Sequence, residues 1–171
     1  RTGKAISLTD LLDEIPVDAC RWFFNAKPET QMEFDLGLAV REDSENPVYY
    51  VQYAYARICT LLKNLAAEGY SVPRAAEADL SALNGEEEKA LIKQLAQYPA
   101  VVVLAARDYD PSFINRYLSD LAAAFHKFYN ACRIKGEAEN VLLARLKLAD
   151  TARAVLKNGM TLIGCSAPEK M

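Results

Sequence analysis

The sequence of 171 residues predicts an all-α protein, a helical bundle with a small irregular appendage at its N-terminal end. Apolar residues recur every three or four positions through the long stretches, which is typical of helices with one buried side. Prolines and acidic residues stand where these stretches begin, as they do in first helical turns. Apolar residues make up 51% and charged residues 25% of the chain, so we expect a packed globular core.

The first 45 residues are predicted to form short elements. Ser7 or Thr9 can cap a helix over Asp10–Ile15, because a hydroxyl can accept a hydrogen bond from a first-turn N–H. A second helix over Pro16–Phe24 begins with a proline and carries the single tryptophan. Residues 32–36 alternate between apolar and polar side chains, which is typical of a very short strand, and a short helical stretch follows.

A long helix is predicted to begin at Asn46-Pro47 and to extend to about Glu68. Proline is favoured in the first helical turn, because the N–H that it lacks has no partner there. At about 100° per residue, six apolar or aromatic residues fall on one side of this helix and form a buried stripe. These are Val48, Val51, Tyr55, Ile58, Leu62 and Leu65.

The middle of the chain is predicted to form a loop and an interrupted helix. Residues 69–71 and 74–85 are rich in small and polar side chains and form the loop. A helix begins at the acidic run Glu86–Glu88, whose charges suit the positive end of a helix dipole. Pro99 kinks or breaks this helix before the apolar run Ala100–Ala106.

Two more long helices complete the predicted bundle. One begins at residues 110–112 and ends at Gly136, and the other extends from about Glu139 to Ile163. Each carries an inward apolar set at helical spacing. The inward residues are Leu118, Leu121, Ala122, Phe125, Phe128 and Cys132 in the first, and Leu142, Leu146, Ala149, Leu156, Met160 and Ile163 in the second.

The charge distribution argues against two classes of partner. The net charge is −3, of which residues 1–45, with five Lys and Arg against ten Asp and Glu, contribute −5 and residues 46–171 contribute +2. This is too weakly basic for sequence-independent DNA binding, so any nucleic acid would be held largely by shape and stacking. No apolar run approaches the roughly 18–20 residues of a membrane span. We therefore expect neither DNA nor a membrane as a partner.

The cysteines and the single histidine argue against a metal site and against self-contained catalysis. Four cysteines stand far apart without a Cys-x-x-Cys pair, so we expect buried free thiols, a reducing compartment and a cytoplasmic location. One histidine is too few for the usual zinc sites. No nucleophile arrangement or phosphate-binding loop is apparent, so we predict no catalytic residue in this chain.

The long helix carries a second face that folding does not require. Tyr50, Tyr53 and Arg57 lie roughly opposite the apolar stripe. Flat rings beside an arginine suit unstacked nucleobases, because every base has a π-face, so we expect these residues to contact RNA. Gln52 lies beside them and can donate to a base edge. Two alternatives stay open: the tyrosines pack against the acidic appendage, or they form a non-catalytic protein-interaction module, since interfaces use the same residue types.

Four segments of the chain carry most of a family resemblance, which DACRWFF at residues 18–24 and MEFDLGLA at 32–39 continue. The four are NPVYYVQYAYARI at residues 46–58, HKFYNACRI at 126–134, the terminal stretch 144–171 with its final methionine, and RTGKAISLTDLLDEI at 1–15. The first three resemble the DALR anticodon-binding domain of class I arginyl-tRNA synthetases. The last is similar to the stretch that follows the KMSKS-type loop of that family. The likeness therefore covers essentially the whole chain.

The resemblance implies a domain boundary and further site residues. Residues 1–45 would be the C-terminal end of the catalytic module after the KMSKS-like loop, and residues 46–171 the DALR anticodon-binding helical domain. Tyr129 and Arg133 match family positions that face the anticodon loop. Met171 matches a final methionine that the family holds near the same site, so we expect all three to bind tRNA.

Two other positions are affected by the resemblance. Lys4 would lie close to the ATP phosphates of the catalytic module, but without the rest of that loop it has nothing to act on. Tyr55 stands where the family usually has a histidine. Its helical phase places Tyr55 with the buried stripe, so we do not expect it to contact RNA.

The function that the resemblance implies is recognition of the anticodon of an arginine tRNA, centred on its middle cytosine. The intact protein would be an arginine–tRNA ligase, which attaches arginine to its tRNA using ATP with Mg²⁺. The HIGH-type motif and the nucleotide-binding fold of the family do not appear here, so we expect no cofactor in this chain and no activity from it alone. Because the chain begins at Arg1 without methionine, we expect a piece of a longer synthetase, whose remainder would be a partner beside the tRNA.

Overall fold

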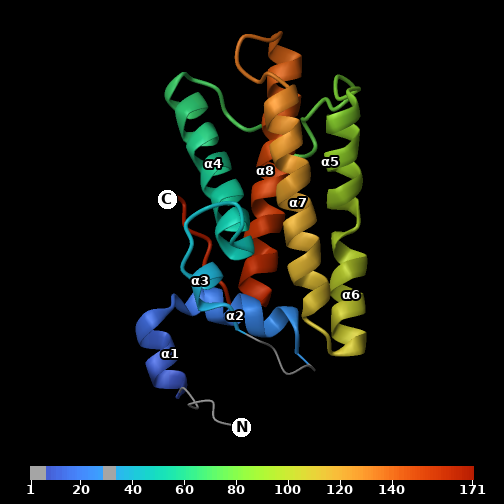
Figure 1. The fold of residues 1–171 in the computed structure, drawn as a ribbon. Helices are drawn as coiled ribbons and strands as arrows, with labels where there is room; N and C mark the ends of the chain where they lie inside the picture. Colours follow the sequence, from blue (N-terminus) through green and yellow to red (C-terminus); the bar gives the residue numbers. More distant parts are fainter. Residues whose placement is uncertain (1–6, 29–33) are drawn as a thin grey trace.

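The computed structural model describes residues 7–28 and 34–171, and these residues form eight helices and no strand. The predicted all-α fold is confirmed. The long helices stand side by side, and the first three short helices lie at one end of them (Figure 1). The helices are α1 (Leu8–Glu14), α2 (Val17–Ala26), α3 (Leu36–Ala39), α4 (Pro47–Ala67), α5 (Glu86–Ala96), α6 (Tyr98–Asp108), α7 (Ser112–Ala131) and α8 (Glu139–Leu162).

Helix α7 lies in the middle of the bundle and contacts α2, α4, α5, α6 and α8. Its inward residues Leu118, Leu121 and Phe125 are fully buried. Burial of a side chain of this size contributes about 1.5–3 kcal/mol. All six residues predicted to face inward from α8 are buried as well. The periodicity of the sequence therefore identified the core correctly.

Helices α7 and α8 pack closely at Gly159. A Cβ atom built on Gly159 would lie 2.7 Å from Cδ2 of Leu118, a residue that is itself fully buried. Protein interiors are close-packed, so a side chain at this position would have to displace the leucine. The glycine therefore allows the two helices to pack at this short separation.

Helix α4 carries the buried stripe as predicted, except that Leu62 is only half-buried. It begins at a proline, as expected. Asn46, the residue before the helix, donates from Nδ2 to the carbonyls of Ala39 at 3.2 Å and Arg41 at 2.8 Å. The loop between α3 and α4 carries Ser44, and these bonds attach the end of this loop to α3.

Helices α1 and α2 follow the elements predicted for them. Ser7 caps α1, because its Oγ accepts a hydrogen bond from the N–H of Asp10 at 3.2 Å. Helix α2 buries Trp22, whose carbonyl accepts a hydrogen bond from Nδ2 of Asn115 on α7 at 3.1 Å. Helix α2 also contacts α4, so the N-terminal part packs directly on the bundle. The domain boundary between residues 45 and 46 stays a prediction.

The predicted short strand is wrong where the structure can be described. Phe34 and Asp35 belong to no strand, and residues 32 and 33 lie outside the described residues, as does Lys4. Asp35 instead caps α3, because its Oδ1 accepts a hydrogen bond from the N–H of Leu38 at 3.0 Å. A capping side chain fixes the backbone for the start of a helix. This hydrogen bond outweighs the preference for a strand that the apolar–polar alternation over five residues indicated.

The predicted end of α7 is also wrong, whereas the break at Pro99 is confirmed. Helix α7 ends before Cys132, which adopts an extended backbone with φ −107° and ψ 106° and is buried. Gly136, with φ +88°, turns the following loop instead of ending the helix. Helix α5 ends and α6 begins just before Pro99, as its missing N–H requires.

A buried ion pair joins α5 to α8. The acidic run starts α5 as predicted, and the side chain of its third residue, Glu88, is only 1% exposed. Its Oε1 accepts a hydrogen bond from Nε of Arg145 at 2.6 Å, and its Oε2 accepts one from the N–H of Gly85 at 2.7 Å. Arg145 also donates to the carbonyl of Arg133, which attaches the loop between α7 and α8 to the same pair.

The cysteines are all free thiols, and three of the four are buried, with Cys59 half-buried. Burial raises the pKa of each thiol, and it raises the pKa of Cys165 to about 12. Every helix of residues 7–28 and 34–171 is too short or too polar to cross a membrane. Over the same ranges, the His, Cys, Asp and Glu side chains form no group of three that could hold a metal ion.

Candidate nucleic-acid interface

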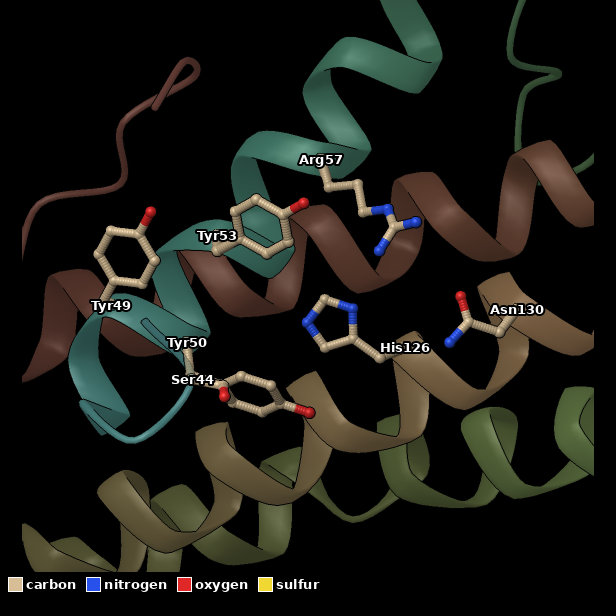
Figure 2. A pocket seen from close by; sticks show the side chains of 7 residues that line it. All are labelled: Ser44, Tyr49, Tyr50, Tyr53, Arg57, His126 and Asn130. Carbon is tan, nitrogen blue, oxygen red and sulfur yellow. The ribbon is translucent and has the colours of Figure 1, made fainter. Parts of the chain in front are cut away.

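A cleft of about 430 Å³ opens between the N-terminal half of α4 and the C-terminal half of α7. We call it the tyrosine cleft. Figure 2 shows tyrosines and an arginine from α4 on one side, with a histidine and an asparagine from α7 on the other. The lining residues are Ser44, Tyr49, Tyr50, Tyr53, Arg57, His126 and Asn130.

The aromatic rings of the cleft are arranged for stacking. Tyr49 and Tyr53 are one helical turn apart, and their rings are stacked, with 6.4 Å between centroids and planes only 8° apart. The ring of His126 reaches between Tyr50, at 4.9 Å, and Tyr53, at 6.0 Å (Figure 2). Tyr53 is 43% exposed, so one side of its ring is available to a ligand. Burial raises the pKa of the half-buried Tyr50, whose hydroxyl therefore stays a donor at neutral pH.

Arg57 is held in place by an aromatic ring of α7. Its Cζ lies 4.1 Å from the ring centroid of Tyr129, a cation–π contact of about 0.5–1 kcal/mol at a partly exposed site. Guanidinium N–H groups that do not point at the ring can donate to a phosphate or a base edge. The side chain therefore combines a fixed position with open hydrogen-bonding capacity.

The tyrosine cleft continues along α4 and α7 as two further hollows. A hollow of about 230 Å³ shares Tyr53 and Arg57 with the cleft and is also lined by Tyr129 and Met171. A third, of about 460 Å³, shares Tyr129 and extends to Arg133. The three together form a groove, which we call the α4–α7 groove.

The two ends of the α4–α7 groove differ in charge. At the N-terminal end of α4, Arg41 pairs with Asp43 at 2.7 Å and with Glu45 at 2.6 Å, so the loop that carries Ser44 is acidic overall. At the other end, the exposed side chain of Arg133 stands beside Lys135, which pairs with Glu68 at 2.7 Å. A phosphate backbone would therefore favour the end near Arg133.

Six of the seven residues predicted to bind tRNA line this groove. Tyr50, Tyr53 and Arg57 meet in the tyrosine cleft, and Tyr129, Arg133 and Met171 line the hollows that continue it. The binding roles of these residues stay predictions. Tyr55 is fully buried, as its helical phase predicted.

Gln52 is the exception among the predicted site residues. It is only 8% exposed, and its Nε2 donates to Oδ2 of Asp18 at 2.8 Å and to the carbonyl of Ser166 at 3.1 Å. An amide engaged inside the protein cannot also present these hydrogens to a base. Gln52 therefore holds chain segments together and does not face the groove.

Sequence reasoning missed His126, Tyr49, Asn130 and Ser44 as lining residues. His126 is half-buried, as expected of a residue at the boundary of a helix face, and its Nε2 is buried and has no hydrogen-bond partner among the described residues. It stands three residues before Tyr129, a spacing that places both side chains on one face of α7. That spacing was the available signal.

Burial lowers the pKa of His126, and the positive charge of Arg57 lowers it further. The unfolded chain should therefore take up a proton near pH 6.5, before the folded chain does. We expect the free energy of unfolding to fall as the pH drops from about 7.5 through 6.5 to 5.5. Over this range the imidazole is protonated more readily in the unfolded chain than in the folded chain, and each proton taken up favours unfolding. Urea denaturation at several pH values measures this loss.

His126→Gln is the control for this pH dependence, since the chain has no other histidine. Glutamine does not titrate, so the variant should lose much less stability between about pH 7.5 and 5.5 than the parent chain. The same loss in both proteins would contradict the assignment to His126.

Comparisons with known proteins agree with this geometry. The family description "DALR anticodon binding domain" matches residues 51–171. The chain is similar to the arginine–tRNA ligases of Acetivibrio thermocellus and Ruminiclostridium cellulolyticum, at 51% and 48% identity; both alignments cover 100% of this chain and 30% of the relative. Its fold is similar to Thermus thermophilus arginyl-tRNA synthetase, with a TM-score of 0.78 and 26% identity over 98% of this chain and 28% of that one. The chain thus spans about 30% of the length of these curated relatives.

Proposed function

Because this chain belongs to the DALR anticodon-binding domain family, we propose that it binds the anticodon loop of an arginine tRNA in the α4–α7 groove. One observation carries the proposal: the partly exposed ring of Tyr53 stands opposite His126 in an open cleft that packing alone does not require. Exposed aromatic rings of this kind receive the bases of single-stranded RNA loops.

In this proposal one part of the groove contacts an RNA base and another part contacts RNA phosphates. An unstacked anticodon base lies on the ring of Tyr53, while Tyr50 and His126 form the closed side of the cleft. Arg57, oriented by Tyr129, donates to that base or to its phosphate. Arg133 at the basic end contacts a second phosphate. The middle cytosine of the anticodon is the base that we expect in the cleft.

We further propose that the chain acts within a longer arginine–tRNA ligase, since it covers about 30% of the curated relatives that it matches. Residues 1–45 would end the catalytic module, and binding at the groove would position the distant acceptor end of the tRNA. The whole protein would act in the cytoplasm and attach arginine using ATP with Mg²⁺. The chemistry of ATP and Mg²⁺ would belong to the remainder of that protein, about 70% of whose length lies outside the stretch that this chain matches. This chain alone should not charge tRNA.

The competing function is a protein-interaction module that docks a partner on the same aromatic groove. Tyrosine and arginine are also the residues that dominate protein interfaces, so composition does not separate the two. Salt dependence and base selectivity do separate them, because only RNA binding releases counterions from phosphates.

Fluorescence titration with the anticodon stem-loop of an arginine tRNA tests the proposal. If two or three phosphates are contacted, affinity should fall about tenfold between about 50 and 200 mM salt. A stem-loop with the middle base replaced should bind about tenfold more weakly, because the buried polar groups of the cleft then lack their partners.

Each alternative outcome is informative. Equal affinity for both stem-loops would mean that the groove does not select the anticodon. Failure to bind either stem-loop would favour the protein-interaction module. Aminoacylation by the isolated chain would contradict the proposal that catalysis resides elsewhere.

A further inference from the structure

The chain segment after α8 is attached to α2 through one carboxylate, that of Asp18. Its Oδ1 accepts a hydrogen bond from the N–H of Ser166 at 3.1 Å. Its Oδ2 accepts hydrogen bonds from Oγ of Ser166 and from Nε2 of Gln52, the latter at 2.8 Å. A single side chain of α2 thus joins the C-terminal segment to α4.

Two further residues of α2 hold the same segment. Nη1 of Arg21 donates to the carbonyl of Gly164 at 2.5 Å, and Nδ2 of Asn25 donates to the carbonyl of Ile163 at 2.9 Å. Gly164 has φ +75°, so the backbone reverses direction there, in a conformation that suits glycine. Helix α2 therefore receives the chain directly after it leaves α8.

The last five residues, 167–171, extend from this attachment along α4, and the C-terminus lies beside that helix (Figure 1). Met171 lines the hollow that contains Tyr53 and Arg57. It also lines a separate hollow of about 210 Å³ that contains Asp18 and Tyr49. The end of the chain thus lies between the Asp18 attachment and the tyrosine cleft.

Five residues can span at most about 17 Å, so fixing Ser166 limits where Met171 can lie. Chain ends otherwise lose their order unless they are tied down. None of the residues 167–171 provides a hydrogen bond to another described residue, whereas Ser166 takes part in four, two with Asp18 and two with Gln52. The hydrogen bonds of Ser166 therefore fix the start of the tail, next to Ala167, which packs against the core.

We propose that Asp18 is a positioning residue for RNA binding: it holds Ser166 and Gln52 so that Met171 completes the wall of the α4–α7 groove. This inference rests on the proposed function of the groove. It assigns to α2, none of whose residues lines the tyrosine cleft, a role in the affinity for the anticodon loop. It also explains why Gln52 turns inward from a helix face whose neighbours face the groove.

The test compares Asp18→Asn with Asp13→Asn in the 171-residue chain. An asparagine in place of Asp18 keeps the size but presents an NH₂ group where Gln52 and Ser166 also donate, so the attachment should open. Asp13 is exposed on α1, and its replacement removes the same charge. Asp18→Asn should weaken stem-loop binding about three- to tenfold although it removes a negative charge, whereas Asp13→Asn should not weaken it.

A chain lacking residues 167–171 separates positioning from general damage. Without the tail, Asp18→Asn should cause no further loss of affinity, because the groove wall that it positions is already missing. An equal loss with and without the tail would overturn the proposal. Ser166→Ala removes the hydroxyl that donates to Asp18. If Asp18→Asn is too unstable to purify, this variant takes its place and should show part of the same loss of affinity.

Hydrogen exchange without RNA gives a readout independent of the proposed function. The amide of Ser166 should exchange at least about tenfold faster in Asp18→Asn than in Asp13→Asn, because asparagine leaves one acceptor oxygen for the three donors that the two carboxylate oxygens served. Unchanged exchange would overturn the attachment itself. If the Ser166 amide exchanges faster in Asp18→Asn but the parent chain binds no stem-loop, the proposed function fails. If the parent chain binds and both variants bind equally well, the positioning role fails.

Discussion

Replacing Tyr53 with alanine should weaken binding of the arginine-tRNA anticodon stem-loop on the order of ten- to a hundredfold, since a base stacked on an aromatic ring contributes about 1–3 kcal/mol. Tyr53 is the most exposed of the cleft rings that face His126, so its replacement should remove few contacts from the chain without RNA. Its removal should change the free energy of unfolding by no more than about 1 kcal/mol. Fluorescence titration and urea denaturation of the same samples measure both quantities.

Two matched variants control the Tyr53 experiment. Tyr53→Phe keeps the ring and should bind within about threefold of the parent chain, because stacking does not need the hydroxyl. Tyr109→Ala removes an exposed tyrosine from the end of α6, on the opposite side of α7 from α4, and should leave binding unchanged (Figure 1). Equal effects of Tyr53→Ala and Tyr109→Ala would argue against stacking in the cleft.

Replacing Glu88 with glutamine should lower the free energy of unfolding by about 3 kcal/mol, because it leaves a mostly buried arginine with only the more distant and partly exposed carboxylate of Glu137, at 3.7 Å. The side chain of Glu88 is 1% exposed and that of Arg145 is 16% exposed. Glutamine has nearly the same shape, so the loss would report the charge and not a cavity. Urea denaturation, which gives the free energy of unfolding directly, is the measurement.

Glu86→Gln is the control for this variant, since Glu86 is exposed in the same first turn of α5. It should change stability by less than about 0.5 kcal/mol. The double variant Glu88→Gln with Arg145→Gln should be less destabilised than the sum of the two single variants, because removing both charges leaves no buried charge unpaired. Additive losses would show that the two charges act independently.

Much of this fold could be predicted from the sequence because its core is built on local periodicity. The stripe of α4 and the inward residues of α7 and α8 follow from spacing alone, and burial agrees with all but Leu62. Family membership also agrees with the resemblance carried by residues 46–58 and 144–171. What spacing cannot supply is the partner of a polar residue.

Two polar residues show this limit. The sequence predicted Glu88 as part of a helix-start charge run, but the ion pair with Arg145 could not be predicted, because Arg145 stands 57 positions away in the sequence. Gln52 was assigned to the RNA face because its partners, Asp18 and Ser166, are 34 and 114 positions away. Helical phase gives the direction of a side chain, but only the packed structure shows whether another segment covers it.

For the same reason, only part of the candidate site could be predicted from the sequence. The wall formed by α4 was visible in the order of its tyrosines. The opposite wall, with His126 and Asn130, required α7 to be placed against α4. Met171 entered only through the resemblance, since no periodicity reaches the last residue of a chain.

The central position of α7 has a consequence for the proposed recognition. This helix forms the middle of the core and also one wall of the cleft, and it packs closely against α8 at Gly159. A shift of α7 would therefore disturb the packing of the core, which favours a cleft whose backbone is preorganised. If the chain binds an RNA loop as proposed, we expect the loop to unstack its bases to fit this wall, while the backbone of α7 stays in place.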